Sequence, residues 1–409
     1  MSGAQAGRMS LAGALRTVRQ DLLASEHPAL GEAGGAGAAF ECCASRVREG
    51  DELRLEVQDE AGQVFVLARH VAQALPLDPH AAAARLLARP LAQAGLAQRL
   101  LRVDWPVLAG LVARHTQVLR AGPHDVGTHG PVPSAPTVSL VVCLSSALDG
   151  LELLLLRLGQ DAWLREHAEL VLVLDNPAQA DALREQAPWL AALYHMPLRW
   201  VWGHARRGLA EAYTLGARVA QAPWLVFLNG AVWPTAPGWV QPLLAALMQD
   251  GVGAVAPVLE RPDGTLDQAG LDYRWDALQQ VWQPHAPQQG LARAQTLLPQ
   301  GGQRVPLLGS ACLAVHRTTL EALGGWDPHA LLSPGWEGPT LSQALRAQGL
   351  ACACVGTVRL THVPEQAVPP AWREAGLHQR AEWLNSVWHH WRWAPAIETM
   401  VNAQEGRVA

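Results

Sequence analysis

The sequence predicts an α/β protein built on a mainly parallel β-sheet with helices on both faces, together with a small N-terminal α+β module and a C-terminal helix. One observation supports each of these three parts. Continuous apolar runs of strand length alternate with amphipathic segments between residues 138 and 229. A hairpin pattern and helical spacing before residue 120 predict a separate small α+β module. A Trp- and Arg-rich segment after residue 365 predicts a C-terminal helix.

The composition is typical of a folded chain and argues against a nucleic-acid binder. Of the 409 residues, 49% are hydrophobic and 16% are charged, which allows a large core. The length allows two domains, or one large domain with extensions. The formal net charge is -5, whereas binding to nucleic-acid phosphates requires a basic face. We therefore expect no nucleic-acid partner.

The cysteines and the absence of long apolar runs indicate a cytoplasmic protein. Six cysteines occur, mostly within apolar runs, which favours reduced and buried thiols. Cys352 and Cys354 are separated by one residue, a poor match to zinc-site spacing, so core packing is the preferred interpretation. No stretch of about 18 uninterrupted apolar residues predicts a membrane span. Peripheral contact with the inner membrane face stays open.

Residues 1–120 are expected to form the α+β module, and they show no recognisable chemistry. Alternating apolar and polar residues over 53–57 and 64–67 are typical of a hairpin. Apolar residues at helical spacing predict helices over 10–25 and within 78–120.

Residues 121–136 (AGPHDVGTHGPVPSAP) are dense in Gly and Pro without periodicity, so they are predicted to be a linker. The main domain is expected at 137–365, followed by an extension at 366–409. Within the domain, strands are expected over 138–144, 169–174, 198–202 and 224–228. Helices are expected between them, over 148–160, 178–193 and 208–221.

Two polar residues directly follow strands of the predicted sheet. Asp175 ends the second strand and Asn229 ends the fourth. Ligands of such sheets bind beyond the carboxyl ends of the strands, so both side chains are expected to face a ligand. Helix capping is the alternative, and Asn176-Pro177 fits it well. Capping leaves Asp175 unexplained, which favours a functional role.

The order of motifs from residue 136 to 365 resembles glycosyltransferase family 2. In the first half, the segments that carry the resemblance are VSLVVCL (138–144), LVLD (172–175), GLAEAYTLG (208–216), LVFLN (225–229) and Pro234. In the second half, they are PVLERPDGTLDQAG (257–270), LGSACLAVHR (308–317), LGGWD (323–327), the helical region 337–350 and Thr361-His362.

The resemblance implies a GT-A fold and inverting, hexosyltransferase-like transfer of a sugar from a nucleotide-diphosphate donor. The implied acceptor is a glycan or a lipid-linked molecule, in polysaccharide or glycoconjugate synthesis. The implied cofactor is Mg²⁺ or Mn²⁺, because hard cations bound by carboxylates offset the charge of a leaving diphosphate. A carboxylate is also expected as the general base for the acceptor hydroxyl.

Carried over to this sequence, the donor-binding residues are Asp175, Arg206, Arg207 and Asn229. Asp175 would contact the nucleoside, and the two arginines would lie near the phosphates. The other assignments are Glu337 as catalytic base, Trp336 and Gly309 on the acceptor side, and His362 as a late metal ligand.

Several carboxylates of the family pattern are missing. The acidic metal-binding triplet reads Asn229-Gly-Ala231, and a methyl group cannot bind a cation. Gly338 and Thr340 stand at positions where the family often has acidic residues, and Ala344 replaces a frequent Arg. Metal-independent transfer is therefore a second option, with arginine forks pairing with the phosphates.

Two functions stay open at this level. The first is an active glycosyltransferase with Glu337 as base. The second is a catalytically degenerate GT-A domain that binds a nucleotide or a partner without transferring sugar, because a fold does not guarantee a function.

The C-terminal extension combines aromatic and basic residues. Its tryptophans are Trp372, Trp383, Trp388, Trp391 and Trp393, and they stand among arginines and histidines. Spacing near three to five residues predicts a helix that packs over the domain. A homodimer contact and a peripheral membrane contact are the other interpretations.

Overall fold

The computed structural model describes residues 15–18, 38–41, 49–58, 61, 63–88, 97, 100–145, 148, 150–299, 301–329, 334–363 and 377–408. The chain divides into two units, Met1–Leu108 and Ala109–Ala409. All candidate site residues belong to the second unit.

The first unit contains two antiparallel strand pairs and a short helix. β1 (Leu15–Val18) pairs with β2 (Ala38–Glu41), and β3 (Glu52–Gln58) pairs with β4 (Val64–Val71). The predicted hairpin is thus present, whereas the helix predicted over 10–25 is wrong for the described Leu15–Val18. Helix α1 (Pro79–Leu87) begins at Asp78, whose side chain accepts a hydrogen bond from the Ala81 amide.

A five-residue π-helix (Leu100–Asp104) leads directly into helix α3 (Trp105–Ala121), in which one unit ends and the other begins. The predicted linker at 121–136 is corrected by the next element. Strand β5 (His124–His129) pairs antiparallel with β8 (Leu198–Gly203) along its whole length, from His124 opposite Gly203 to His129 opposite Leu198. Gly127 makes the close pairing feasible, because a Cβ there would lie 2.1 Å from the Trp200 ring.

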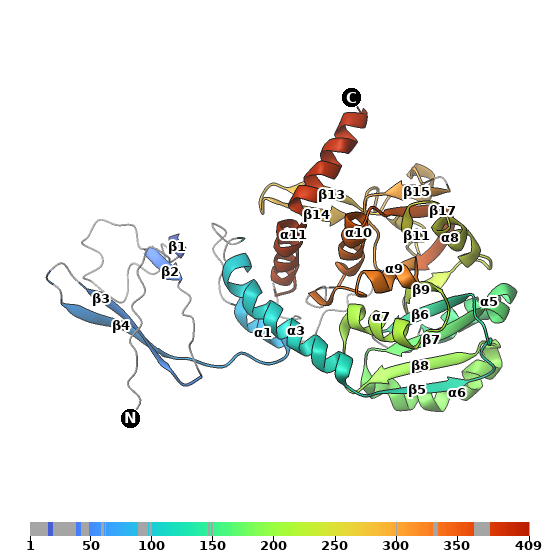
Figure 1. The fold of residues 1–409 in the computed structure, drawn as a ribbon, viewed down its shortest axis with the longest axis horizontal. Helices are drawn as coiled ribbons and strands as arrows, with labels where there is room; N and C mark the ends of the chain where they lie inside the picture. The colour runs from blue at the N-terminus through green and yellow to red at the C-terminus, as the bar shows by residue number, and fades with distance from the viewer. Residues whose placement is uncertain are drawn as a thin grey trace. The chain divides into compact units, whose positions relative to one another are not determined.

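The second unit is built on one large sheet with the strand order β10-β17-β11-β16-β9-β6-β7-β8-β5 (Figure 1). Its centre consists of the parallel strands β8 (Leu198–Gly203), β7 (Ala168–Leu174), β6 (Val138–Leu144) and β9 (Trp224–Asn229). The other strands are β10 (Val232–Pro234), β11 (Val252–Glu260), β12 (Leu266–Gln268), β15 (Gly302–Val305), β16 (Cys312–His316) and β17 (Ala351–His362).

Outside these four strands, β17 pairs in parallel with β11. The other pairs are antiparallel: β16 with β9 and β11, β10 and β15 with β17, β12 with β11, and β5 with β8. The predicted parallel sheet is therefore confirmed in its four central strands, and antiparallel strands extend it on both sides.

Helices cover both faces of the sheet because its central strands are apolar on both sides. Leu140 and Val142 pack with one hydrophobic cluster, whereas Val141 and Cys143 pack with the other. The first face is covered by α4 (Leu151–Gly159), α5 (Ala162–His167), α6 (Ala180–Tyr194) and α8 (Val240–Leu247). The second is covered by α7 (Gly208–Val219), α9 (Arg317–Ala322) and α10 (Glu337–Ala347).

A hairpin, the C-terminal helix and two short 3₁₀-helices are the remaining described elements of this unit. Hairpin β13 (Asp272–Asp276) and β14 (Val281–His285) packs against the C-terminal helix α11 (Leu377–Val408), as Figure 1 shows. Two short 3₁₀-helices, Pro177–Gln179 and Arg293–Gln295, complete the described elements.

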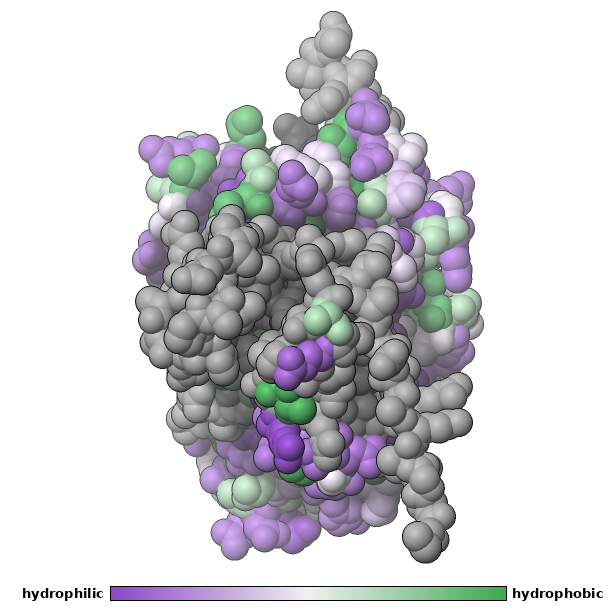
Figure 2. All heavy atoms as spheres, turned by 90° about the vertical axis from the view of Figure 1, so that its left-hand side faces the viewer, coloured by the Kyte–Doolittle hydropathy of each residue, from purple (hydrophilic) through white to green (hydrophobic). Residues whose placement is uncertain are grey.

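The helices, the cysteines and the surface show where apolar groups lie in the described part of the chain. None of these helices is long and apolar enough to cross a bilayer. Cys352, Cys354, Cys312 and Cys143 are all buried, which agrees with the prediction of core packing; Cys42 and Cys43 lie outside the described residues. Figure 2 shows small hydrophobic areas scattered between hydrophilic ones on the face that it presents.

Candidate active site

Asp175 lies where β7 ends and α7 begins. Its Oδ1 accepts hydrogen bonds from the backbone amides of Arg207 (2.7 Å) and Gly208 (2.9 Å). These amides lie at the positive end of the α7 dipole, which explains why an aspartate is stable at this buried position. The carboxylate follows a strand end as predicted, and it also caps a helix. From the sequence alone, contact with a ligand and helix capping are alternative interpretations.

The two predicted phosphate-binding arginines point in different directions. Arg207 is only 4% exposed, and its Nη1 donates a 2.8 Å hydrogen bond to the Leu119 carbonyl at the end of α3. Burial lowers the pKa of Arg207, and the nearby carboxylates of Glu211 and Asp175 partly offset this effect. Arg206 is exposed. Of the pair, Arg206 is therefore the residue that solvent and a ligand can reach.

Asn229 ends β9, and its side chain bonds within the predicted metal-binding triplet. Asn229 Oδ1 accepts a 2.9 Å hydrogen bond from the Ala231 amide, and the Asn229 amide donates to the Ala311 carbonyl. Antiparallel pairing of β10 with β17 places Val232 opposite His362. The topology therefore brings the triplet and His362 together.

The ring of His362 is engaged by a carboxylate that the sequence analysis did not single out. His362 Nδ1 lies 2.7 Å from Asp267 Oδ2, while Asp267 Oδ1 accepts a 3.3 Å bond from Gln289 and faces Arg261 at 3.5 Å. Burial opposes ionisation of Asp267, but the hydrogen bond and charge of His362, then Gln289 and Arg261, bring its pKa below the ordinary value.

These side chains do not fit a hard divalent cation, which prefers several carboxylate or carbonyl oxygens. Ala231 offers no side-chain donor, and Asn229 Oδ1 already accepts an amide proton. Asp267 is paired with His362, which leaves only Nε2 of that ring for another contact. Within the described part of the chain, no group of three His, Cys, Asp or Glu side chains is arranged to hold a metal ion.

Glu337 is the first residue of α10 and is only 3% exposed. Its Oε2 accepts hydrogen bonds from the Ser310 hydroxyl (3.0 Å) and the Gly335 amide (2.8 Å). Burial raises the pKa of Glu337 to about 7, although these hydrogen bonds oppose the shift and Glu382 adds to it. A carboxyl with a pKa near neutrality suits general acid–base chemistry.

The glycine after Glu337 is required by packing. A Cβ at Gly338 would lie 2.4 Å from the Leu308 carbonyl oxygen and 2.7 Å from the Ser310 amide nitrogen. Ser342 fastens the same contact, since its hydroxyl accepts from the Leu308 amide and donates to the Gly338 carbonyl. Position 338 therefore cannot carry a catalytic aspartate in this arrangement.

The two predicted acceptor-side residues lie against polar side chains. The Trp336 indole N–H donates a 3.1 Å hydrogen bond to Glu382 Oε2 of α11. Gly309 lies directly under the Gln268 side chain, because a Cβ there would approach Gln268 Oε1 to 2.0 Å. Trp336, Gln268 and Glu382 all line one cavity.

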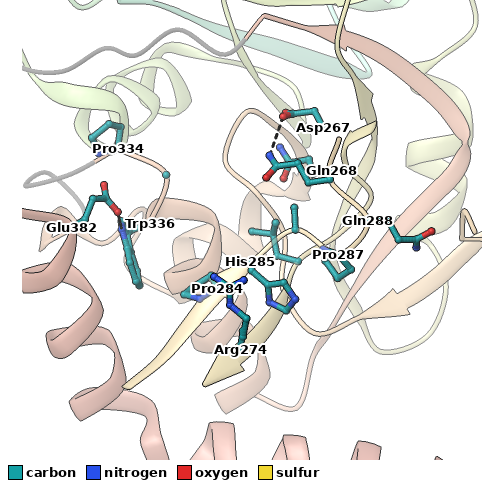
Figure 3. A pocket seen from close by; sticks show the side chains of 14 residues that line it. Asp267, Gln268, Arg274, Pro284, His285, Pro287, Gln288, Pro334, Trp336 and Glu382 are labelled. Atoms are coloured by element: carbon teal, nitrogen blue, oxygen red, sulfur yellow. Dashed lines mark hydrogen bonds between the residues drawn. The ribbon is translucent and has the colours of Figure 1, made fainter. Parts of the chain in front are cut away.

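This cavity has a volume of about 860 Å³, within the usual range for small-molecule sites. Its walls come from four segments: β12 and the loop after it, the β13–β14 hairpin with residues 286–289, the turn 334–336, and α11. Figure 3 shows Glu382 beside Trp336 on one side, Asp267 and Gln268 on another, and Arg274 and His285 near β13 and β14. The lining is mostly polar and carries both signs of charge.

The predicted residues thus fall into three groups. Trp336 lines the cavity, Gly309 lies under its lining residue Gln268, and His362 is joined to it through Asp267. Glu337 lies next to Gly335 and Trp336 in the chain, behind the same wall. Asp175, Arg206 and Asn229 lie at or just after the carboxyl ends of the parallel strands. Arg207 instead donates a hydrogen bond to the Leu119 carbonyl of α3.

Asp267, Arg274, His285 and Glu382 are the charged or ionisable lining residues that the sequence did not reveal. Asp267 lies inside the quoted motif PVLERPDGTLDQAG and was the one with an available signal.

Parts of the chain are similar to a known protein family and to several characterised proteins. Residues 143–303 match the sequence model of glycosyl transferase family 2. Among curated proteins, the O-antigen biosynthesis protein RfbC of Myxococcus xanthus is 25% identical over 263 residues, which cover 60% of this chain and 19% of that protein. Polypeptide N-acetylgalactosaminyltransferase 15 of Mus musculus is 27% identical over 244 residues, covering 56% of this chain and 35% of that protein.

Among solved structures, GalNAc-T7 with UDP, GalNAc and Mn²⁺ aligns with a TM-score of 0.45 at 20% identity, covering 58% of this chain and 46% of that one. The mannosyltransferase PcManGT from Pyrobaculum calidifontis, in complex with GDP-Man and Mn²⁺, aligns with a TM-score of 0.41 at 17% identity, covering 78% and 93%.

The chain spans about a fifth to a third of the length of these two curated relatives. The family match begins near the end of β6 and ends in β15, so it contains the central strands β7, β8 and β9 and the strand ends that carry Asp175 and Asn229. The central part of this α/β chain, residues 143–303, is therefore similar to glycosyl transferase family 2.

Proposed function

We propose that the protein transfers a sugar from a nucleotide-diphosphate donor to a glycan or lipid-linked acceptor in polysaccharide or glycoconjugate synthesis. The observation that carries this proposal is a buried carboxyl with a pKa near 7, Glu337, directly behind the Trp336 wall of a polar cavity in a family-2 domain. The named relatives are transferases or biosynthetic proteins, so the alternative of a non-catalytic binding module is not favoured.

In this proposal the donor lies at the strand ends and the acceptor in the 860 Å³ cavity. Asp175 and Asn229 contact the donor, with exposed Arg206 near its phosphates. Arg207 is left out, because its guanidinium is committed to Leu119. Glu337 takes the proton of the acceptor hydroxyl as the new glycosidic bond forms and the nucleoside diphosphate leaves.

The metal requirement is part of the proposal. The two solved structures named above contain Mn²⁺, which keeps a divalent cation in view. The donor atoms around Ala231 and His362 favour transfer without a cation at the family position, with arginine charge offsetting the leaving diphosphate. Turnover that persists in excess EDTA supports this view, and turnover that EDTA abolishes and Mn²⁺ restores contradicts it.

The test of the transferase function is release of UDP or GDP from UDP-sugars and GDP-sugars by purified protein. Glu337→Gln is expected to lower turnover by at least about 100-fold, since it removes a general base while keeping the shape. Glu321→Gln is the matched control, because Glu321 is an exposed glutamate on neighbouring α9. Equal turnover by Glu337→Gln and wild type would remove Glu337 from the mechanism.

The cytoplasm remains the proposed location, supported by the buried thiols of Cys312, Cys352 and Cys354. For a membrane or dimer contact of the C-terminal helix, one described tryptophan is exposed enough to take part. Trp388 is buried and Trp383 and Trp393 are half-buried, whereas Trp391 is 63% exposed; Trp372 lies outside the described residues. Trp391→Ala is expected to abolish liposome flotation or dimerisation if either contact exists.

A further inference from the structure

Helix α11 holds the cavity wall that contains Trp336. Its Glu382 accepts the indole hydrogen bond of Trp336 at 3.1 Å, and its His389 ring lies 5.4 Å from the Trp336 ring. Trp336 is only 7% exposed, so its position is fixed by these contacts. A residue 46 positions further along the chain therefore determines how Trp336 faces the cavity.

The same helix holds a second wall. The Tyr273 hydroxyl of β13 hydrogen-bonds His389 Nε2 at 2.6 Å, and the Trp282 amide of β14 donates to His390 Nδ1 at 3.3 Å. These two strands carry the cavity residues Arg274 and His285. One helix thus spans two walls and contributes Glu382 to the lining itself.

The lining indicates the kind of ligand. Carboxylates of Glu382 and Asp267 accept hydrogen bonds, while an indole provides apolar surface beside them. Hydroxyl groups donate readily to carboxylates, and charge-assisted bonds of this kind are stronger than neutral ones. At the wall formed by Glu382 and Trp336, a phosphate group would meet a like charge, so a neutral polyhydroxyl ligand fits this wall better.

From this juxtaposition we propose that Glu382 on α11 is an acceptor-specificity residue, whose carboxylate binds hydroxyl groups of a neutral saccharide lying against Trp336. The inference rests on the proposed transferase function for its biological meaning, but sugar binding at Glu382 does not require turnover. The C-terminal helix then forms part of the acceptor site as well as a cover for the domain.

The first test measures binding alone. Lactose, maltose, cellobiose and N,N′-diacetylchitobiose are titrated into full-length protein and followed by saturation-transfer NMR. Wild type is expected to bind at least one disaccharide, and Glu382→Gln to bind it about 10-fold more weakly, because a neutral amide accepts a weaker bond from a hydroxyl. The amide oxygen can still accept from Trp336, so the wall should keep its shape.

Glu398→Gln is the matched control, since Glu398 is an exposed glutamate on the same helix outside the cavity lining. It is expected to bind like wild type. Equal binding by Glu382→Gln and wild type overturns the proposal. Wild-type protein that binds none of the four disaccharides also overturns it.

The second test separates recognition from structural support. With a disaccharide acceptor, Glu382→Gln is expected to raise the acceptor KM about 10-fold with a much smaller change in kcat, whereas Glu398→Gln keeps both constants at the wild-type values. A fall in kcat without a rise in KM would indicate a structural role and overturn the proposal. Glu382-dependent sugar binding without any turnover would instead refute the transferase function and leave this inference standing.

Discussion

Gly338 shows how a single residue shapes the catalytic centre. Family resemblance places an acidic residue there, but its Cα lies against the backbone of Leu308 to Ser310, with no space for a Cβ. The first turn of α10 approaches this segment so closely that Ser342 can join both. The missing carboxylate is thus part of the packing, and the chemistry depends on Glu337.

Restoring the family residue is therefore expected to damage the protein. Gly338→Ala should lower the free energy of unfolding by about 2–4 kcal/mol, and Gly338→Asp should do so more strongly without raising activity. Gly110→Ala is the control, because Gly110 lies exposed in α3 with open space around it; it should be neutral or slightly stabilising. Denaturant melts report both, and a stable, more active Gly338→Asp variant would contradict this account.

Glu337 also makes a testable contribution to stability. Its pKa is about 7 in the folded chain against an ordinary 4.5, so the native state holds a proton that the unfolded state has lost. Stability from this group is therefore lost as pH rises from 4.5 to 7. Relative to Glu337→Gln, wild type should lose on the order of 2 kcal/mol between pH 5 and pH 8. Parallel urea-melt profiles for the two proteins would argue against the shift.

At the scale of elements, α11 is joined to the domain by polar contacts, some of them buried. Tyr273 accepts a hydrogen bond from Gln343 and contacts His389, while Arg392 pairs with Asp327 at 2.5 Å. The predicted packing of this helix over the domain is therefore observed. Asp327 also accepts a hydrogen bond from the His329 backbone amide, and so stabilises its own turn.

His389 makes the docking of α11 sensitive to acid. Burial lowers its pKa to about 3, with further lowering from Arg392 and His390, so the native ring is neutral. The unfolded ring gains a proton near pH 6.5, and the stability from this group is lost as pH falls from there towards 3. This slope is opposite to that of Glu337, and the two partly cancel between pH 4.5 and 6.5.

Replacing His389 should therefore reveal the Glu337 contribution. His389→Gln is expected to become more stable as pH falls from 6.5 to 5, whereas wild type changes little over that range. His204→Gln, at an exposed histidine, is the control and should follow wild type. Chemical denaturation at several pH values measures this, and a wild-type-like profile for His389→Gln would refute the assignment.

At the scale of the whole molecule, the sequence predicted the scaffold better than the site. Apolar runs such as 138–144 and 169–174 determine strands through local periodicity, and both are confirmed. The position of Asp175 after a strand was also readable. The inward direction of Arg207 was not, because it depends on a contact with Leu119, 88 residues away.

The cavity depends even more on distant contacts. Its walls combine residues 267–289 with a turn near 335 and a helix after 377, and only the assembled chain places Asp267 beside His362 or Glu382 beside Trp336. Local patterns carry no information about such encounters. The same limitation explains why strand β5 was taken for a linker, since its six residues are mostly exposed and follow no apolar pattern.

Strand β5 decides where a shortened protein has to begin. Removing everything before residue 137 would leave the backbone groups of β8 unpaired, and with them the indole of Trp200 against which His129 now stacks at 5.0 Å. A bare edge of this kind invites association between copies. Recombinant protein starting at 137 is thus expected to precipitate or elute as large oligomers in size-exclusion chromatography, while protein starting at 109 stays dispersed.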